Sequence, residues 1–258
     1  MIALAIPLGV AIGLIVGAVG GGGAILALPV LVYLLDQPVG PASTASLVVV
    51  AVAAAVGAGS LARHGHVCWT VALAFSAPAA AASIVGTLAN DAVSPRVLIL
   101  SFVPVMAIAA GATWQRASAG HTDDRPACPH IPYARAAIAG AGVGLLTGFF
   151  GVGGGFMIVP VLTLWLGVPF RRAVATSLVI ITLTGVAALA SHLVGGARMD
   201  VGITAELALA TAAGAVFGTS IGRRLPHAVL GRAFAVVVAA VGVFLLVDVL
   251  ALGGPPGA

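Results

Sequence analysis

The chain has 258 residues, of which 61% are hydrophobic and 7% are charged, with a formal net charge of +4. A soluble domain carries roughly 25% charged residues, so these few charges could not cover the surface of a water-soluble protein of this length. Every basic residue other than histidine is an arginine, and the arginines stand in breaks between apolar stretches. Without a basic or aromatic stripe, a nucleic-acid partner is excluded.

Ten apolar segments follow one another along the chain, and each is continuous and rich in Ala, Val and Leu. Several reach the ~20 residues with which a helix crosses a ~30 Å hydrocarbon core. Only helices or closed barrels satisfy the backbone in lipid, and the lack of alternation excludes a barrel. The segments of the first half are 2–19, 24–35, 44–62, 67–89 and 97–114. Those of the second half are 135–150, 155–167, 173–194, 201–222 and 228–252. The predicted fold class is an all-α polytopic membrane protein, with the lipid bilayer as its surroundings.

The first segment has no charged residue ahead of it and continues into a longer apolar pattern. It is therefore predicted to be retained as a membrane segment, not cleaved as a signal peptide. Cys68 and Cys128 lie in different segments without metal-ligand spacing, so neither a disulfide nor a zinc site is predicted. No cofactor is expected.

The two halves of the chain are copies of each other. Gly13–Val48 aligns without a gap to Gly144–Val179 at a shift of 131 positions, and 15 of the 36 aligned residues are identical. The same shift relates Gly65 to Gly196 and Pro95 to Pro226. Residues 1–115 and 134–258 are therefore predicted to be two membrane repeats, joined by a polar linker over 116–133.

Five segments per repeat would insert the two copies in opposite orientations, and the arginines agree with this. One face would carry nine arginines: Arg63, Arg116, Arg125, Arg135, Arg171, Arg172, Arg223, Arg224 and Arg232. The other face would carry only Arg96 and Arg198. Because cytoplasmic loops are enriched in arginine, the linker is predicted to be cytoplasmic and both termini outside. Inverted repeats are typical of secondary transporters, which bind their solute near the midplane between broken helices.

A glycine-rich turn splits the first two segments of each repeat. The turns are GAVGGGG in the first copy and GFFGVGGG in the second, and they include Gly20, Gly21, Gly22, Gly23, Gly151, Gly153, Gly154 and Gly155. Tandem glycines interrupt a helix, let a backbone approach closely, and leave free N–H groups at the start of the next helix, which favours an anion. These glycines are predicted to line a solute site or to act as hinges. Two other glycine series, Gly9/Gly13/Gly17 and Gly140/Gly144/Gly148, fit close helix packing better.

These motifs carry a resemblance to a known family. Two G-x-x-G-x-G-G-type turns, each followed by a proline-led polar turn and then by STASL (Ser43–Leu47) or VATSL (Val174–Leu178), resemble the sulfite exporter TauE/SafE family over nearly all of 1–252. The resemblance implies a bacterial inner-membrane permease whose partner is a small anionic solute, such as sulfite, a sulfonate or a related organic anion.

Hydroxyl groups follow each glycine turn, at Ser43, Thr44, Ser46, Thr176 and Ser177. They could cap the helix start, bond back to the preceding turn of the chain, or donate to an oxyanion. Glu206 is the one acidic residue well inside an apolar stretch, which makes it a candidate for proton coupling or an interfacial carboxylate.

The predicted function is a secondary transporter that exports small anions, and two alternatives stay open. An anion channel on the same repeat is one. The other is an intramembrane enzyme, which needs a nucleophile and a base in reach of each other. Ser177 and His192 lie about four turns apart on one predicted helix, too far to meet, so no enzyme is expected. A homo-oligomer stays open as well.

Overall fold

The computed structural model describes residues 2–90, 95–118, 128–150, 155–194 and 199–248, and every regular element within these ranges is helical. The first half contains α1 (Ile2–Val19), η1 (Gly21–Gly23), α2 (Ala24–Pro29), η2 (Val30–Leu34), α3 (Val39–Ala62), α4 (Trp69–Asn90) and α5 (Pro95–Ser118). The second half contains α6 (Tyr133–Phe150), α7 (Gly155–Pro160), η3 (Val161–Trp165), α8 (Phe170–Val194), α9 (Val201–Arg224) and α10 (His227–Val247).

Six of the described helices are long and apolar enough to cross a membrane, so the prediction of an α-helical membrane protein is confirmed. They are 40–62, 69–89, 133–150, 170–191, 201–224 and 228–247. Shorter apolar helices lie at 5–19, 24–34 and 155–165.

The predicted segment ends that fall on described residues hold within a few residues, except at the start of α3, and the predicted end at 252 lies outside the described residues. This helix begins at Val39, five residues before the predicted 44, with Pro38 as its N-cap residue at φ −58° and ψ 143°. Proline is tolerated in the first turn of a helix because the N–H that it lacks would have no partner there. The polar stretch around Ser43 and Thr44 is therefore helical, although its composition suggested a turn.

A wide helical turn follows the proline of each short helix. Pro29 ends α2 and Pro160 ends α7, and a five-residue π-helix continues each of them. Each π-helix closes with a bond that spans five residues, from Leu35 N–H to the Val30 carbonyl (3.1 Å) and from Leu166 N–H to the Val161 carbonyl (3.1 Å). The same register break at equivalent positions is a structural counterpart of the sequence repeat.

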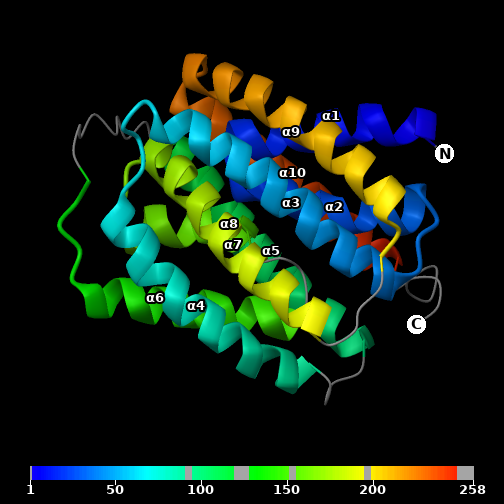
Figure 1. Ribbon diagram of the computed structural model, residues 1–258. Helices are drawn as coiled ribbons and strands as arrows, with labels where there is room; N and C mark the ends of the chain where they lie inside the picture. Colours follow the sequence, from blue (N-terminus) through cyan, green and yellow to red (C-terminus); the bar gives the residue numbers. More distant parts are fainter. Residues whose placement is uncertain (1, 91–94, 119–127, 151–154, 195–198, 249–258) are drawn as a thin grey trace.

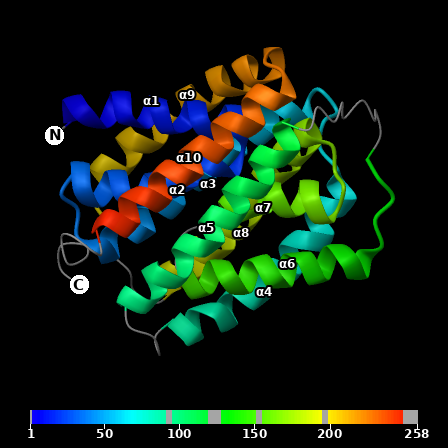
Figure 2. The same cartoon turned by 180° about the vertical axis from the view of Figure 1, so that it is seen from behind.

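The two ends of the bundle differ in charge. The start of α1 and the end of α10 lie at one end, on the right of Figure 1 and the left of Figure 2. The end of α5 and the start of α6 lie at the opposite end, where eight arginines gather: Arg63, Arg116, Arg135, Arg171, Arg172, Arg223, Arg224 and Arg232. We call these two ends the termini end and the arginine end. Arg96, at the start of α5, lies at the termini end, while Arg125 and Arg198 fall outside the described residues.

Glycines let two pairs of helices pack backbone against backbone. A Cβ added at Gly13 or Gly17 of α1 would overlap carbonyl oxygens of α9, and one added at Gly140 or Gly144 would overlap carbonyl oxygens of α4. The glycines of α9 pack against the backbone of α1 in the same way, at Gly214, Gly218 and Gly222. The packing role predicted for these glycine series is confirmed. Because α4 and α6 occupy the positions in the repeat that α9 and α1 occupy, the two pairs are equivalent.

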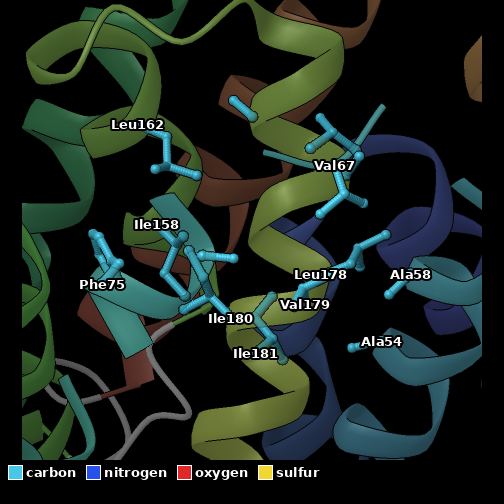
Figure 3. Packing of buried hydrophobic residues seen from close by; sticks show 14 of the residues in the cluster. Ala54, Ala58, Val67, Phe75, Ile158, Leu162, Leu178, Val179, Ile180 and Ile181 are labelled. Atoms are coloured by element: carbon cyan, nitrogen blue, oxygen red, sulfur yellow. The ribbon is translucent and has the colours of Figure 1, made fainter. Parts of the chain in front are cut away.

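Helices α3 and α8 pack against each other in the interior, and the short helices fill the space beside them. Figure 3 shows Ile158 and Leu162 of the second hairpin on one side of α8, near Phe75 of α4. Leu178 on the other side of α8 faces Ala54 and Ala58 of α3. The middle of α8 is therefore buried on all sides, and residues 173–181 are all buried.

The glycine packing yields a paired prediction on one helix. Gly144→Ala should lower stability by at least the 1–3 kcal/mol typical of overpacking, because the new methyl group meets the backbone of Ala79. Gly142→Ala should raise stability by roughly 0.5–1 kcal/mol, because nothing lies within 4 Å of its added Cβ and alanine is the better helix former. The measurement is the midpoint of thermal unfolding in detergent. Equal midpoints for the two variants would contradict the close packing of α4 and α6.

Candidate functional site

The glycine turn of the first repeat meets the second repeat inside the bundle. Helix α1 ends where the Gly20 N–H donates to the Val16 carbonyl (2.8 Å), and Gly20 then takes a φ of 82° that side chains other than glycine rarely adopt. A Cβ at Gly21 would overlap the backbone of Gly155, the first residue of α7. We call this contact between Gly20–Gly23 and Gly155 the glycine crossing.

Close packing accounts for part of the glycine sequence. A Cβ at Gly23 would lie 2.6 Å from a Val16 methyl group and 2.7 Å from the Val16 nitrogen, so this glycine lets the hairpin close. A Cβ at Gly155 would lie 3.0 Å from Ile181 and 3.2 Å from Ala24. Gly151, Gly153 and Gly154 lie outside the described residues, and the surroundings of Gly22 are not described either.

The hydroxyl of Ser177 lies at the glycine crossing. A Cβ at Gly20 would lie 2.8 Å from the Ser177 Oγ, which donates to the Val174 carbonyl (2.8 Å). Ser177 is completely buried, as is Thr176 beside it. The Oγ1 of Thr176 accepts a hydrogen bond from the Cys68 backbone N–H (3.1 Å), which ties α8 to the start of α4. The structure thus brings Ser177 to the glycine turn and gives Thr176 a structural bond.

The hydroxyls of the first repeat bond mainly within their own helix. Ser43 Oγ donates to the Gly40 carbonyl (3.1 Å) and Ser46 Oγ donates to the Ser43 carbonyl (2.8 Å). Thr44 is buried, whereas Ser43 and Ser46 are half-buried. The helix-bonding alternative of the sequence analysis therefore describes Ser43 and Ser46 in this structure.

Glu206 lies one and a half turns into α9, at the termini end. Its side chain is half-buried, and its Oε2 is buried without a hydrogen-bond partner among the described residues. Asp200, by contrast, caps the same helix by accepting from the Ile203 N–H (3.1 Å). The Glu206 carboxylate is therefore partly covered, and the proton-coupling role stays a prediction.

One sequence-based prediction was wrong. Cys68 and Cys128 form a disulfide with a Cα–Cα distance of 5.8 Å, although no disulfide was predicted. Sixty residues separate them, and only the fold brings the end of the linker back to the start of α4. The structure also shows a buried contact that the sequence does not indicate: Asp248 is buried and accepts a hydrogen bond from the Tyr33 hydroxyl (2.8 Å). No local pattern in the sequence points to a contact across 215 positions.

Hydrogen bonds join the basic residues at the arginine end to several helices. Arg223 of α9 contacts the Nε2 of His64, whose Nδ1 lies 2.8 Å from the Ser60 carbonyl. Arg171 Nη2 donates to the Leu225 carbonyl (3.2 Å), and Arg172 Nη1 donates to the Gly65 carbonyl (3.2 Å). These residues were interpreted only as topology signals, but they also connect α3, α8 and α9. Within the described ranges no group of three His, Cys, Asp or Glu side chains could hold a metal ion.

Comparison with known proteins relates nearly the whole chain to membrane transporters. The family described as "Sulfite exporter TauE/SafE" matches residues 5–245. A "Probable membrane transporter protein" of Xylella fastidiosa (strain 9a5c) is 29% identical over 243 residues, which is 91% of each chain. Its counterpart in strain Temecula1 is 30% identical over 246 residues, again 91% of each chain. The "Probable membrane transporter protein YunE" of Bacillus subtilis (strain 168) is 40% identical over 80 residues, 31% of this chain and 28% of its own. No solved structure matches significantly.

Proposed function

We propose that this chain, which belongs to the sulfite exporter TauE/SafE family of membrane transporters, is a secondary transporter that exports small sulfur-containing or organic anions, such as sulfite or sulfonates, across the bacterial inner membrane. The observation that carries the proposal is the glycine crossing. A broken hairpin from one repeat meets the broken hairpin of the other inside the bundle, beside a buried hydroxyl. Such meetings of interrupted helices are where secondary transporters bind their solutes.

The lengths of the short helices support a site at the crossing. The apolar helices at 24–34 and 155–165 rise about 16 Å at 1.5 Å per residue, roughly half of a ~30 Å hydrocarbon core. Each begins inside the bundle and returns to the end from which its hairpin entered. Their first backbone N–H groups therefore lie deep in the protein, where they favour an anion without any buried cation.

The proposed site consists of the two glycine turns and the hydroxyls after them. We assign the backbone N–H groups of both turns, 20–23 and 151–155, to the anion. Of these residues, the structure describes the surroundings of Gly20, Gly21, Gly23 and Gly155, and Ser177 lies beside Gly20. Ser46 is the equivalent of Ser177 in the repeat. Backbone dipoles and hydroxyls bind a small oxyanion weakly enough to release it, which transport requires.

Opposite insertion of the two repeats also belongs to the proposal. Helices α1 and α5 run toward the arginine end, whereas their equivalents α6 and α10 run away from it (Figure 1). The positive-inside rule puts the arginine end in the cytoplasm, with both termini outside. The Cys68–Cys128 disulfide argues for the opposite orientation, because cytosolic reductants oppose disulfides, and the labelling experiment below decides between the two.

The transport proposal predicts saturable sulfite flux. The full chain, purified and reconstituted in liposomes, should take up sulfite at a rate that levels off with concentration, because a carrier has a finite number of sites. Flux that rises in proportion to concentration would indicate a channel instead. No flux above that of protein-free liposomes, for sulfite or for small sulfonates, would contradict the proposed function.

A hydroxyl pair on α8 tests the site within the same assay. Ser177→Ala should raise the half-saturating sulfite concentration several-fold, because it removes the hydroxyl at the glycine crossing. Thr182→Val is the matched control, since Thr182 makes the same kind of bond to its own helix, to the Leu178 carbonyl (2.8 Å). Equal changes in both variants would show that loss of the helix bond, and not of a solute contact, is responsible.

Glu206 is predicted to carry the proton that couples to anion flux. Glu206→Gln should flatten the pH dependence of sulfite transport without reducing the amount of inserted protein, because glutamine keeps the shape but cannot titrate. Asp200→Asn is the control, since it changes a carboxylate on the same helix that serves as a cap. An unchanged pH profile for Glu206→Gln would make Glu206 an interfacial carboxylate.

The orientation is tested by labelling at Ser118, an exposed residue at the end of α5. In a background with Cys68→Ala and Cys128→Ala, Ser118→Cys should resist a membrane-impermeant maleimide in intact cells and react after the cells are opened. Ready labelling of intact cells, the outcome that the Cys68–Cys128 disulfide favours, would place the arginine end outside.

A further inference from the structure

Three of the four buried side-chain atoms that lack a hydrogen-bond partner in the described chain lie around one cavity. The four atoms are His66 Nδ1, Arg171 Nε, Glu206 Oε2 and Arg223 Nε. His66, Arg171 and Arg223 all line a partly open cavity of about 20 Å³ at the arginine end, between the α3–α4 connection, the start of α8 and the end of α9. Buried polar groups are normally satisfied, so this grouping calls for a ligand.

The chemistry of the lining selects an anion. Among the described residues that line the cavity, three are basic and none is acidic. Arg171 is the second residue of α8, where the helix dipole disfavours a cation. An oxyanion would accept hydrogen bonds from the free guanidinium N–H groups and offset both this dipole and the repulsion between the arginines.

The cavity adjoins the glycine crossing. Its lining includes Gly17 of α1 and Val174 of α8. Gly17 lies one turn before Gly20, and the Val174 Cα would lie 3.4 Å from a Cβ at Gly20. The inner wall of the cavity is therefore the outer wall of the glycine crossing. One water molecule needs roughly 10–15 Å³ of such volume, so the cavity has room for a single oxygen atom. An oxyanion would therefore enter with one oxygen pointing inward.

We propose that Arg171, Arg223 and His66 form a vestibule that binds an oxyanion at the arginine end before it passes to the glycine crossing. The vestibule rests on the proposed transport function, whose solute it would receive. The repeat equivalents of the three residues in the sequence are Gly40, Ala92 and Ala197, none of which carries a polar side chain. The internal symmetry of the protein is thus broken where an anion would first bind.

His66 makes the vestibule sensitive to pH. Burial lowers the pKa of the His66 imidazole, and the nearby charges of Arg172, His64, Arg171 and Arg223 lower it further. The groups that face it are Arg171 and Arg172 on α8, Arg223 on α9 and His64 on its own connection. The imidazole is therefore neutral over more of the physiological range than an ordinary histidine, and it gains its charge only as the pH falls. A bound dianion would favour the charged form.

Direct binding of sulfate tests the vestibule. Sulfate stays a dianion throughout the range in which histidine titrates. Calorimetric titration of the full chain in nanodiscs of phosphatidylcholine should show binding that Arg171→Gln and Arg223→Gln each weaken roughly tenfold. Arg224→Gln is the matched control, since it makes the same change at an exposed neighbour and should alter the affinity less than about twofold. Equal affinities in all four proteins overturn the proposal.

Lysine variants keep the test decisive if a glutamine variant unfolds. Arg171→Lys and Arg223→Lys retain the charge but lose the fixed guanidinium fork, so sulfate binding should weaken several-fold while the melting temperature stays near that of the wild type. Wild-type affinity in both would overturn the role of the guanidinium groups. Sulfate affinity should rise as the pH falls through the lowered pKa of His66, and His66→Gln should remove this rise. A rise that persists in His66→Gln would overturn the role of the imidazole.

Two further measurements distinguish the vestibule from a lipid-binding site and from the transport function itself. At high salt, sulfate affinity in nanodiscs that contain phosphatidylglycerol should stay within about twofold of that in phosphatidylcholine nanodiscs. Loss of sulfate binding in phosphatidylglycerol would assign the arginines to a lipid phosphate and overturn the proposal. Sulfite flux is measured on the same variants. If sulfate binding depends on the arginines but the wild type transports nothing, the transport function is overturned and the anion site remains. Transport by the wild type, together with sulfate binding that does not depend on the arginines, would overturn the vestibule and leave the transport function.

Discussion

Backbone N–H and C=O groups must be satisfied within the protein wherever lipid surrounds it, and this constraint governs the architecture. The short helices that begin near Ala24 and at Gly155 leave their first N–H groups deep in the bundle. Such ends are tolerable only where other helices enclose them. Helices α3 and α10 contact α2, and α5 and α8 contact α7, so these four helices enclose the starts of the short helices.

The glycine turns serve packing and access at the same place. Gly21 and Gly23 have no room for a side chain, since Gly155 and Val16 fill the space beside them. Gly20 adds a backbone conformation that few other residues adopt. Tight packing is compatible with transport, because a carrier alternates between two conformations that are each well packed. A substitution at one of these glycines would disturb folding as well as solute binding, so Ser177 offers the cleaner test of binding.

Charge distinguishes the two ends of a bundle that its repeats would otherwise make alike. The arginine end carries the vestibule, the connection with His64 and His66, and the cysteine pair. The termini end carries Glu206 and the buried contact between Tyr33 and Asp248. An anion would meet cations at one end and carboxylates at the other, so the field across the protein has a direction. This asymmetry is the basis on which the proposed orientation puts the arginine end in the cytoplasm.

The sequence by itself determined the helical membrane class, the ten apolar segments, the repeat and the family, because hydrophobic length and glycine spacing are local properties of the chain. It also determined the packing role of Gly13 and Gly144, since small residues at helical spacing have one main use in a membrane. Only the tertiary structure decided the Cys68–Cys128 bond, the burial of Asp248 and the cavity between Arg171, Arg223 and His66. Each of these joins residues from separate helices. Neither composition nor period encodes which helix ends meet, because the packing of the whole bundle sets those distances.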